Sequence, residues 1–375
     1  MKIRTIVIGA FLALSCSLIA QESVYKFTKI VENPATPIKD QSETGTCWCF
    51  GTTSFIESEL IRTGKGEFDL SEMFTVRHNY NKRIYDNFIR RGRGNVNPGS
   101  LAHMAINMMS QHGLVPESAY DGINYDSEKH NHNELSSYIK ALASVTTERG
   151  VLTPESKELQ EALFDIYLGK LPETFEYNGK EYTPLSFKEY LGLDFSDYVE
   201  ITSFSHHPFY QQVQVEVPDN WDHQTMYNVP IDEFMKIINN SLENGYTLVW
   251  DGDCSEAAYV FSKELCIVPV DKSLTRKQIE EVVEKEIIPE IEVDQAVRQQ
   301  MFETFETVDD HLEHITGIYK DQNGTVYYQT KNSWGLDRNG TGYHKMSENF
   351  VKGKTISILV NKNGIPKDIR KKLGL

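Results

Sequence analysis

The pattern of the sequence changes near residue 201, and this change constrains the fold more than any other feature. Before it, apolar residues recur at helical spacing. After it, short runs rich in β-branched and aromatic residues alternate with turns. Helices are predicted around residues 47–63, 101–112, 127–144, 154–167 and 186–190, with charged helices at 231–243 and 275–305. Strands are predicted at residues 213–217, 247–250, 315–319, 325–330 and 355–360.

These patterns divide the chain into a mostly helical lobe (about residues 40–200), a β-rich lobe (about 201–362) and a tail (363–375). Of the 375 residues, 39% are apolar and 25% are charged, so the chain can bury a large core and is not disordered. The formal net charge is −16. This acidity argues against nucleic acid as a partner, because phosphate binding needs a basic surface.

The first twenty residues are predicted to form a secretory signal peptide. A basic start precedes an apolar run, residues 6–20, that is too short to span a membrane and is followed by polar residues. Cleavage after this run would leave residues 21–375 as an exported protein, periplasmic or extracellular. Lipid attachment at Cys16 is the alternative, because the residues before it loosely resemble a bacterial lipobox. No later segment is apolar for long enough to predict a membrane span.

Four cysteines follow the signal, which is too few to hold a chain of this size together by disulfides. Cys254 and Cys266 could form a local disulfide or remain as two inert thiols. The pair Cys47 and Cys49 lacks a matching second pair of metal ligands, so no zinc site is predicted.

Cys47 has the features of a nucleophile. It opens the first predicted helix directly after a turn that contains Gly45. Its sulfur would therefore lie near unpaired backbone N–H groups and the positive end of the helix dipole, which favour thiolate over thiol. Gln41, six residues earlier, offers a side-chain amide to the same place. One amide and one backbone N–H can together form an oxyanion hole.

The base is predicted in a second stretch, more than 260 residues further along the chain. Two β-rich runs joined by an Asn-Gly turn predict a hairpin that brings His311 near Asn332. A cysteine nucleophile needs a base, and the base needs a group that orients it. The imidazole and the carboxamide oxygen can supply these two functions. His314 is the alternative base, but the period of a strand places it on the opposite face.

These motifs resemble those of the papain-like cysteine peptidases, in which Gln and Cys-Trp surround the nucleophile, His lies on one strand and Asn-Ser-Trp-Gly lies on the next. The resemblance implies a two-lobe α+β fold with helical insertions and an active-site cleft between the lobes. It implies no metal and no other cofactor. The implied catalytic residues are Cys47, His311, Asn332 and Gln41, and the implied substrate-binding residues are Gly99, Trp48 and Trp334.

Within that class, the chain is most similar to the bleomycin hydrolase and aminopeptidase C family. Residues 203–209, 215–221, 227–230 and 249–253 resemble segments of that family in the same order. In that family, the C-terminus of the chain lies in the cleft and restricts cutting to N-terminal residues, and the chains form a hexameric ring. The tail of this chain departs from the family's ending and is rich in lysine and arginine. The pair His206 and His207 is interpreted as a structural turn rather than a metal site.

Gly99 and Glu313 lie near the predicted site, and each has its own predicted role. Gly99 matches a family glycine that pairs with an extended peptide, but Pro98 replaces a second glycine and stiffens the loop. Glu313 stands where the family has an apolar residue, and a spacing of two places it on the same face as His311. Glu313 could anchor a substrate amine, or it could lie solvated at the edge of the core.

The predicted activity is hydrolysis of peptide bonds through a thioester acyl-enzyme, by an aminopeptidase of the bleomycin hydrolase type. The alternatives are an endopeptidase, a hydrolase or acyltransferase acting on other amides, and a catalytically silent peptide-binding protein. Peptides are the predicted partners, and the resemblance implies a hexamer. Side-chain specificity and the position of Leu375 relative to the site do not follow from the sequence.

Overall fold

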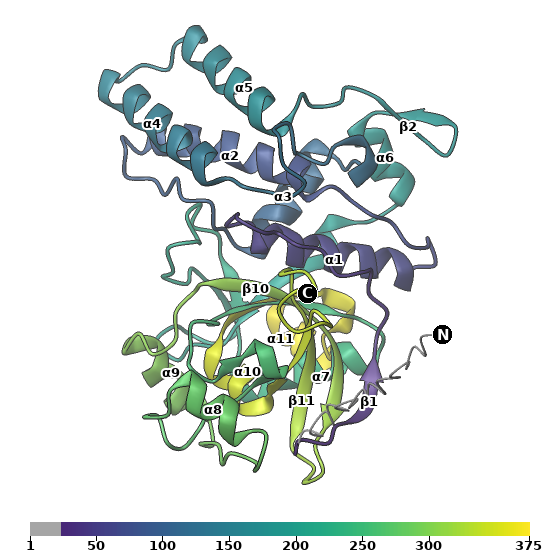
Figure 1. Cartoon of the computed structure of the whole chain (residues 1–375), viewed down its shortest axis with the longest axis vertical. Coiled ribbons are helices and arrows are strands. Elements are labelled where there is room, and N and C mark those ends of the chain that lie inside the picture. The colour runs from purple at the N-terminus through teal and green to yellow at the C-terminus, as the bar shows by residue number, and fades with distance from the viewer. Residues whose placement is uncertain (1–23) are drawn as a thin grey trace, which may run out of the picture.

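The computed structural model describes residues 24–375, so the predicted signal peptide lies outside the described residues. The protein has two lobes (Figure 1). Helices α2 to α6 form one lobe, and a large mixed sheet with helices α7 to α11 forms the other. Helix α1 lies between them and contacts both α3 and the strands β7 and β10. The predicted two-lobe α+β architecture is confirmed.

The helices and strands have the following bounds. The helices are α1 (Cys47–Arg62), α2 (Glu72–Ile89), α3 (Ala102–His112), α4 (Asn133–Arg149), α5 (Pro154–Leu168), α6 (Pro184–Leu191), α7 (Ile231–Glu243), α8 (Arg276–Val282), α9 (Gln295–Glu303), α10 (Glu348–Lys354) and α11 (Lys367–Leu373). The strands are β1 (Thr28–Glu32), β2 (Phe175–Tyr177), β3 (Lys180–Tyr182), β4 (Tyr198–Thr202), β5 (Gln211–Val213), β6 (Met226–Asn228), β7 (Leu248–Gly252), β8 (Tyr259–Val260), β9 (Leu265–Cys266), β10 (His311–Lys320), β11 (Val326–Lys331), β12 (Tyr343–Ser347) and β13 (Thr355–Asn361).

Helix α1 is buried along most of its length, as a central helix must be. It approaches β10 closely at Gly51, where a β-carbon would lie 3.4 Å from the backbone of Leu312 and Glu313. The helix ends before Gly64, whose φ of +76° is one that glycine adopts readily. Gly51 therefore allows the close packing, and Gly64 ends the helix.

The large sheet holds the second part of the site. Its strand order is β5-β6-β4-β13-β7-β10-β11-β12-β9-β8, and β1 pairs with β10. The central pairs, β7 with β10 and β10 with β11, are antiparallel. His311 begins β10 opposite Gly252, and Asn332 directly follows β11. The predicted hairpin is therefore present and places both residues at one end of the sheet.

Each face of the sheet packs against a different hydrophobic core. Val249 and Leu359 pack into the core that contains α1, whereas the neighbouring Trp250 and Ile358 pack into a second core with α7. The tail helix α11 buries Ile369 in this second core. The tail therefore packs on the face of the sheet opposite Cys47, unlike the arrangement that the family resemblance implied. No helix among residues 24–375 is long and apolar enough to cross a membrane.

Two expectations about local structure are wrong. The predicted strand 213–217 is mostly a turn, because β5 ends at Val213 and the Val217 N–H donates to the Val215 carbonyl. Helix α2, with 18 residues, was not predicted. Its buried face includes Arg77, Asn79 and Arg83, so the apolar period that marks a helix is interrupted.

Candidate active site

Cys47 is the first residue of α1 and is nearly buried. The Thr46 side chain does not cap the helix, so the first N–H groups of α1 are not occupied by it. The sulfur of Cys47 accepts a hydrogen bond from the N–H of Leu312, the residue after His311. The predicted nucleophile and base therefore meet where α1 packs against the start of β10.

The sequence predicted surroundings that favour the thiolate form of Cys47, but the charges around the sulfur favour the neutral thiol. Burial and, to a smaller extent, the carboxylates of Asp219, Asp309 and Asp251 raise the pKa of the Cys47 thiol to about 12. The Leu312 N–H acts in the opposite direction. The helix start supplies N–H groups as expected, but three acidic side chains nearby oppose their effect on the thiol.

His311 is oriented by Asn332. The Nε2 atom of His311 lies 3.0 Å from Oδ1 of Asn332, and the Ser333 N–H donates to the same oxygen at 2.7 Å. The Trp334 ring stacks on the imidazole at 4.8 Å between centroids and shields this hydrogen bond. Because Nε2 is used by Asn332, Nδ1 is the nitrogen that can exchange a proton with a nucleophile.

Glu313 is fully buried behind this pair and cannot anchor a substrate amine from solvent, nor is it a solvated edge residue. Its Oε1 accepts hydrogen bonds from the Tyr259 hydroxyl and, at 3.1 Å, from Nδ2 of Asn332. Nδ2 of Asn332 also donates to the Tyr259 oxygen at 2.9 Å. Oε2 of Glu313 lies 3.0 Å from Nε2 of His344 without a hydrogen bond. These contacts fix the Asn332 amide with its oxygen toward His311.

His314 lies on the other face of β10. Its Nδ1 is 2.9 Å from the Ser54 hydroxyl of α1, and the hydroxyl also accepts a hydrogen bond from Lys331 at 2.7 Å. Burial and Lys331 lower the pKa of His314 well below its usual range. This residue is therefore held neutral within the interior, away from Asn332.

Gln41 is held against the residue that follows Asn332. Its backbone N–H donates to the Ser333 carbonyl at 2.8 Å, and its Oε1 accepts from the Ser333 hydroxyl at 2.7 Å. Its Nε2 donates to the Thr44 carbonyl at 2.9 Å. An amide nitrogen carries two hydrogens, so a second N–H is available to a substrate oxygen.

The loop that carries Gly99 is supported by Trp48. The indole N–H of Trp48 donates to the Pro98 carbonyl at 3.0 Å, and the side chain has no exposed surface. Trp48 therefore holds the loop from below and does not face a bound peptide, which corrects its expected substrate contact. Gly45 also packs on Pro98, and any side chain there would overlap the proline ring.

A segment of the β-rich lobe, residues 217–222, crosses to the helical lobe and docks on this loop. Asn95 donates from Nδ2 to the Pro218 carbonyl at 2.8 Å, and the Trp221 indole donates to the Ser100 hydroxyl at 3.0 Å. The sequence showed the segment but carried no signal for where it docks. We call residues 217–222 the bridging segment, since it links the two lobes beside Gly99.

His103 fastens the same region. Its Nδ1 lies 2.7 Å from Glu200 of β4, and its Nε2 lies 2.9 Å from Asp222 of the bridging segment. Burial lowers the pKa of His103, but the two carboxylates outweigh this effect and raise it to about 10. A protonated His103 therefore joins α3 to both elements at neutral pH.

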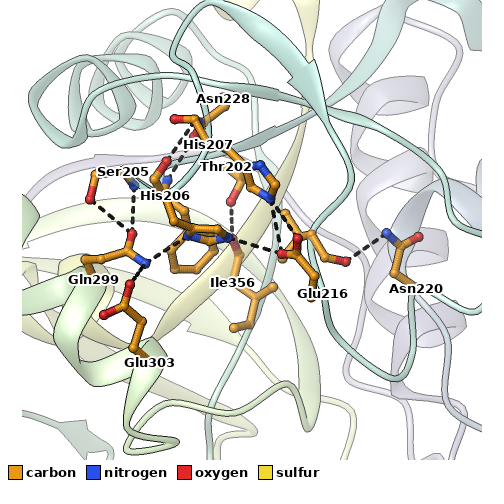
Figure 2. A network of polar contacts seen from close by, with 12 residues as sticks. Thr202, Ser205, His206, His207, Glu216, Asn220, Asn228, Gln299, Glu303 and Ile356 are labelled. Carbon is orange, nitrogen blue, oxygen red and sulfur yellow. Dashed lines mark hydrogen bonds and ion pairs between the residues drawn. The ribbon is translucent and has the colours of Figure 1, made fainter.

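One group of potential metal ligands among residues 24–375 lies outside this site, at His206, His207 and Glu216. Figure 2 shows both imidazoles turned toward the Glu216 carboxylate, at N–O distances of 3.0 to 3.2 Å. Nδ1 of His206 accepts from the Gln299 amide, whose oxygen is occupied by the Ser205 N–H. The His206 proton therefore lies on Nε2 and is donated to Glu216. The contacts support the interpretation as a structural turn.

The four cysteines among residues 24–375 are free thiols. Cys266 is buried in the core that contains α7, whereas Cys254 is partly exposed and near enough to Cys47 and Asp310 for their charges to raise the pKa of its thiol. The possible disulfide between Cys254 and Cys266 is therefore absent from the structure, although both side chains pack against the core that contains α7.

The fold is shared with a solved crystal structure, that of PepW from Lactobacillus rhamnosis HN001. The TM-score is 0.69 at 17% sequence identity, and the match covers 92% of this chain and 84% of PepW. With its helix-borne cysteine facing a sheet-borne histidine and asparagine, the protein has the fold of the papain-like cysteine peptidases.

The particular family follows from the sequence comparisons. The profile of the Peptidase C1-like family matches residues 94–374, so the chain belongs to that family and is a cysteine-type peptidase. Aminopeptidase C of Lactococcus lactis subsp. cremoris is 23% identical over 87% of this chain and 81% of its own length. Bleomycin hydrolase of Gallus gallus is 21% identical over 94% and 86%. Mitochondrial cysteine proteinase 1 of Saccharomyces cerevisiae (strain JAY291) is 21% identical over 92% and 79%.

Proposed function

We propose that this chain is an aminopeptidase that hydrolyses the first peptide bond of its substrates with Cys47, His311 and Asn332. The family assignment supports peptide hydrolysis by a cysteine. The names of the relatives, aminopeptidase C among them, support N-terminal cutting. The observation that carries the proposal is the hydrogen bond of 3.0 Å between His311 and Asn332, made next to the backbone that contacts the Cys47 sulfur.

The proposed reaction begins with transfer of the Cys47 proton to Nδ1 of His311. The thiolate then attacks the carbonyl carbon of the scissile bond. The Cys47 N–H and Nε2 of Gln41 stabilise the oxygen that becomes negative. His311 next donates its proton to the leaving amine, and the C–N bond breaks to leave a thioester. His311 takes a proton from water, which attacks the thioester and releases the acid and the thiol.

The surroundings of His311 suit these proton transfers. Asn332 accepts a hydrogen bond from Nε2, so the ring presents Nδ1 to the sulfur throughout the cycle. Trp334 covers the imidazole on one side and keeps water from competing for Asn332. Trp334 is partly exposed, so it also offers an aromatic surface beside a bound peptide.

The test uses Cys47→Ser with Cys254→Ser as a matched control, because Cys254 is a partly exposed thiol in the same region. Hydrolysis of alanyl-aminomethylcoumarin should be lost in Cys47→Ser by a factor of at least about 10³ and retained in Cys254→Ser. Comparable activity of the two variants would reject Cys47 as the nucleophile. Cleavage of internal bonds in N-blocked peptides at rates equal to those for free peptides would favour an endopeptidase.

Export and assembly are also proposals. The predicted signal peptide supports export, and N-terminal sequencing of the secreted protein should give a chain that starts near residue 21. The likeness to bleomycin hydrolase and aminopeptidase C supports a hexamer. Light scattering after size-exclusion chromatography should give a mass six times that of the chain, and a monomer mass would reject the hexamer.

A further inference from the structure

Three carboxylates from separate parts of the chain converge beside Cys47. Asp219 belongs to the bridging segment, Asp251 to β7, and Asp309 lies two residues before His311. All three act on the charge of the Cys47 sulfur and on one another. The acidic cluster, as we call these three residues, therefore forms part of the surroundings of the nucleophile.

Two members of the acidic cluster have buried carboxylate oxygens without a hydrogen bond, although Oδ2 of Asp251 accepts one from the Ser357 hydroxyl at 3.4 Å. Asp251 is 1% exposed, and its Oδ1 accepts no hydrogen bond. Both carboxylate oxygens of Asp309 are likewise buried and without a donor. The two carboxyl groups face each other, and this contact is favourable only if one of them holds a proton. Burial and the neighbouring carboxylates raise the pKa of Asp309 to about 7.

The protein supplies little positive charge to this cluster. Burial raises the pKa of Asp219 and the charge of Arg83 opposes this rise, but the terminal nitrogens of Arg83 make no hydrogen bond. The groups that act on Asp251 and Asp309 are other carboxyl groups and a backbone N–H, with no lysine or arginine among them. A proton held between Asp251 and Asp309 lowers the cost of burying them, and a cation that arrives with a ligand can take the place of that proton.

The acidic cluster meets the loop expected to bind the peptide backbone. A β-carbon at Gly99 would overlap the Asp219 carboxylate, so this acid lies directly against the glycine. Asp219 and Asp309 are the partly exposed members of the cluster, whereas Asp251 is buried. The bridging segment that carries it is bound to Asn95 and Ser100 on either side of the glycine. A peptide that pairs with Gly99 therefore meets the Asp219 carboxylate and the bridging segment that carries it.

We propose that the acidic cluster binds the N-terminal ammonium group of the peptide substrate, with Asp219 in contact and Asp251 and Asp309 behind it. This inference rests on the proposed aminopeptidase function and names the group that the enzyme recognises. The cluster supplies the negative charge that the family resemblance assigned to the C-terminus. The tail of this chain cannot supply it from its place on the far face of the sheet.

Binding of the ammonium group also acts on the nucleophile. Asp219, Asp309 and Asp251 each raise the pKa of the Cys47 thiol. A cation held among them cancels part of their field and makes loss of the thiol proton easier. A substrate with a free amine therefore helps to form the thiolate that attacks it, whereas a blocked peptide does not.

The first arm of the test compares three substrates on the unmodified enzyme. Alanyl-aminomethylcoumarin carries the α-ammonium, acetyl-alanyl-aminomethylcoumarin carries none, and acetyl-lysyl-alanyl-aminomethylcoumarin carries a side-chain ammonium instead. We expect kcat/KM for the free amine to exceed that for the acetylated alanine by at least about tenfold, since hydrogen bonds to charged groups are strong. A higher value for the lysine substrate would assign the cluster to a side chain and overturn the N-terminal assignment.

The second arm uses Asp219→Asn and Asp309→Asn, which keep the side-chain shape. Glu216→Gln is the matched control, because Glu216 is an exposed carboxylate just before the bridging segment that contacts His206 and His207 instead. The preference for the free amine should fall at least about tenfold in both aspartate variants and stay unchanged in the control. Equal losses for free and acetylated substrates would overturn the proposal. Cleavage that persists in Cys47→Ser would instead overturn the proposed function.

Discussion

Replacing Glu313 tests how the proposed catalytic asparagine is held. The carboxylate accepts hydrogen bonds from Tyr259 and from Nδ2 of Asn332 in a site with no exposed surface. Glu313→Leu keeps most of the volume but removes the acceptor. The Tyr259 hydroxyl is then a buried donor without a partner, and Asn332 keeps only the Tyr259 oxygen as an acceptor for Nδ2.

The expected cost follows from these contacts. A buried donor left without a partner costs about 1–3 kcal/mol, so we expect Glu313→Leu to lower the free energy of unfolding by that amount. An Asn332 amide that turns over places Nδ2 against Nε2 of His311, so kcat should fall at least about tenfold. Glu313→Gln can keep its amide oxygen toward Tyr259 and Asn332. It should therefore retain most of the free energy of unfolding and most of kcat.

The assay combines urea unfolding, followed by fluorescence, with kcat for alanyl-aminomethylcoumarin in the wild type and both variants. The comparison of Leu with Gln separates the hydrogen-bond acceptor from the size of the side chain. If Glu313→Leu keeps the wild-type unfolding free energy and kcat, the idea that Glu313 orients Asn332 is refuted.

Two further predictions concern charged groups. Iodoacetamide should label Cys47 slowly at pH 8, because burial and the acidic cluster raise the pKa of its thiol to about 12. In Asp309→Asn, the midpoint of the labelling rate as a function of pH should move to lower pH. An unmoved midpoint would contradict the effect of Asp309 on the Cys47 thiol. The pKa of His103 is raised to about 10 in the folded protein and is about 6.5 when unfolded. Its contribution to stability is therefore full below about pH 6.5 and is lost as the pH rises toward 10. His103→Gln should flatten the decline in unfolding free energy between pH 7 and 10, and an unchanged slope contradicts the pairing.

Local signals were enough to predict the parts of the site that lie on single elements. The helix at Cys47 begins after a turn with Gly45, and the hairpin that carries His311 and Asn332 has an Asn-Gly turn between two apolar runs. In both cases the decisive residues are neighbours in sequence. The structure has the helix within one residue of its predicted bounds, and it has both strands of the hairpin, the first of which starts four residues earlier than predicted.

The rest depends on contacts between distant segments, which sequence patterns do not carry. Glu313 was recognised as unusual, but its partners Tyr259 and His344 come from other strands. The docking of the bridging segment on Ser100 joins residues more than 110 positions apart. Helix α2 was missed because polar residues on its buried face find partners elsewhere in the fold, so its pattern is not apolar.

Hydrogen bonds fasten the helical lobe to the sheet at several places, among them the bridging segment, His103 and the contact of Gln41 with Ser333. These contacts oppose separation of the lobes, and Cys47 lies nearly buried between them. A loose chain end reaches such a residue more easily than a bulky folded protein does. An enzyme built in this way would trim frayed termini and short fragments while leaving intact domains untouched.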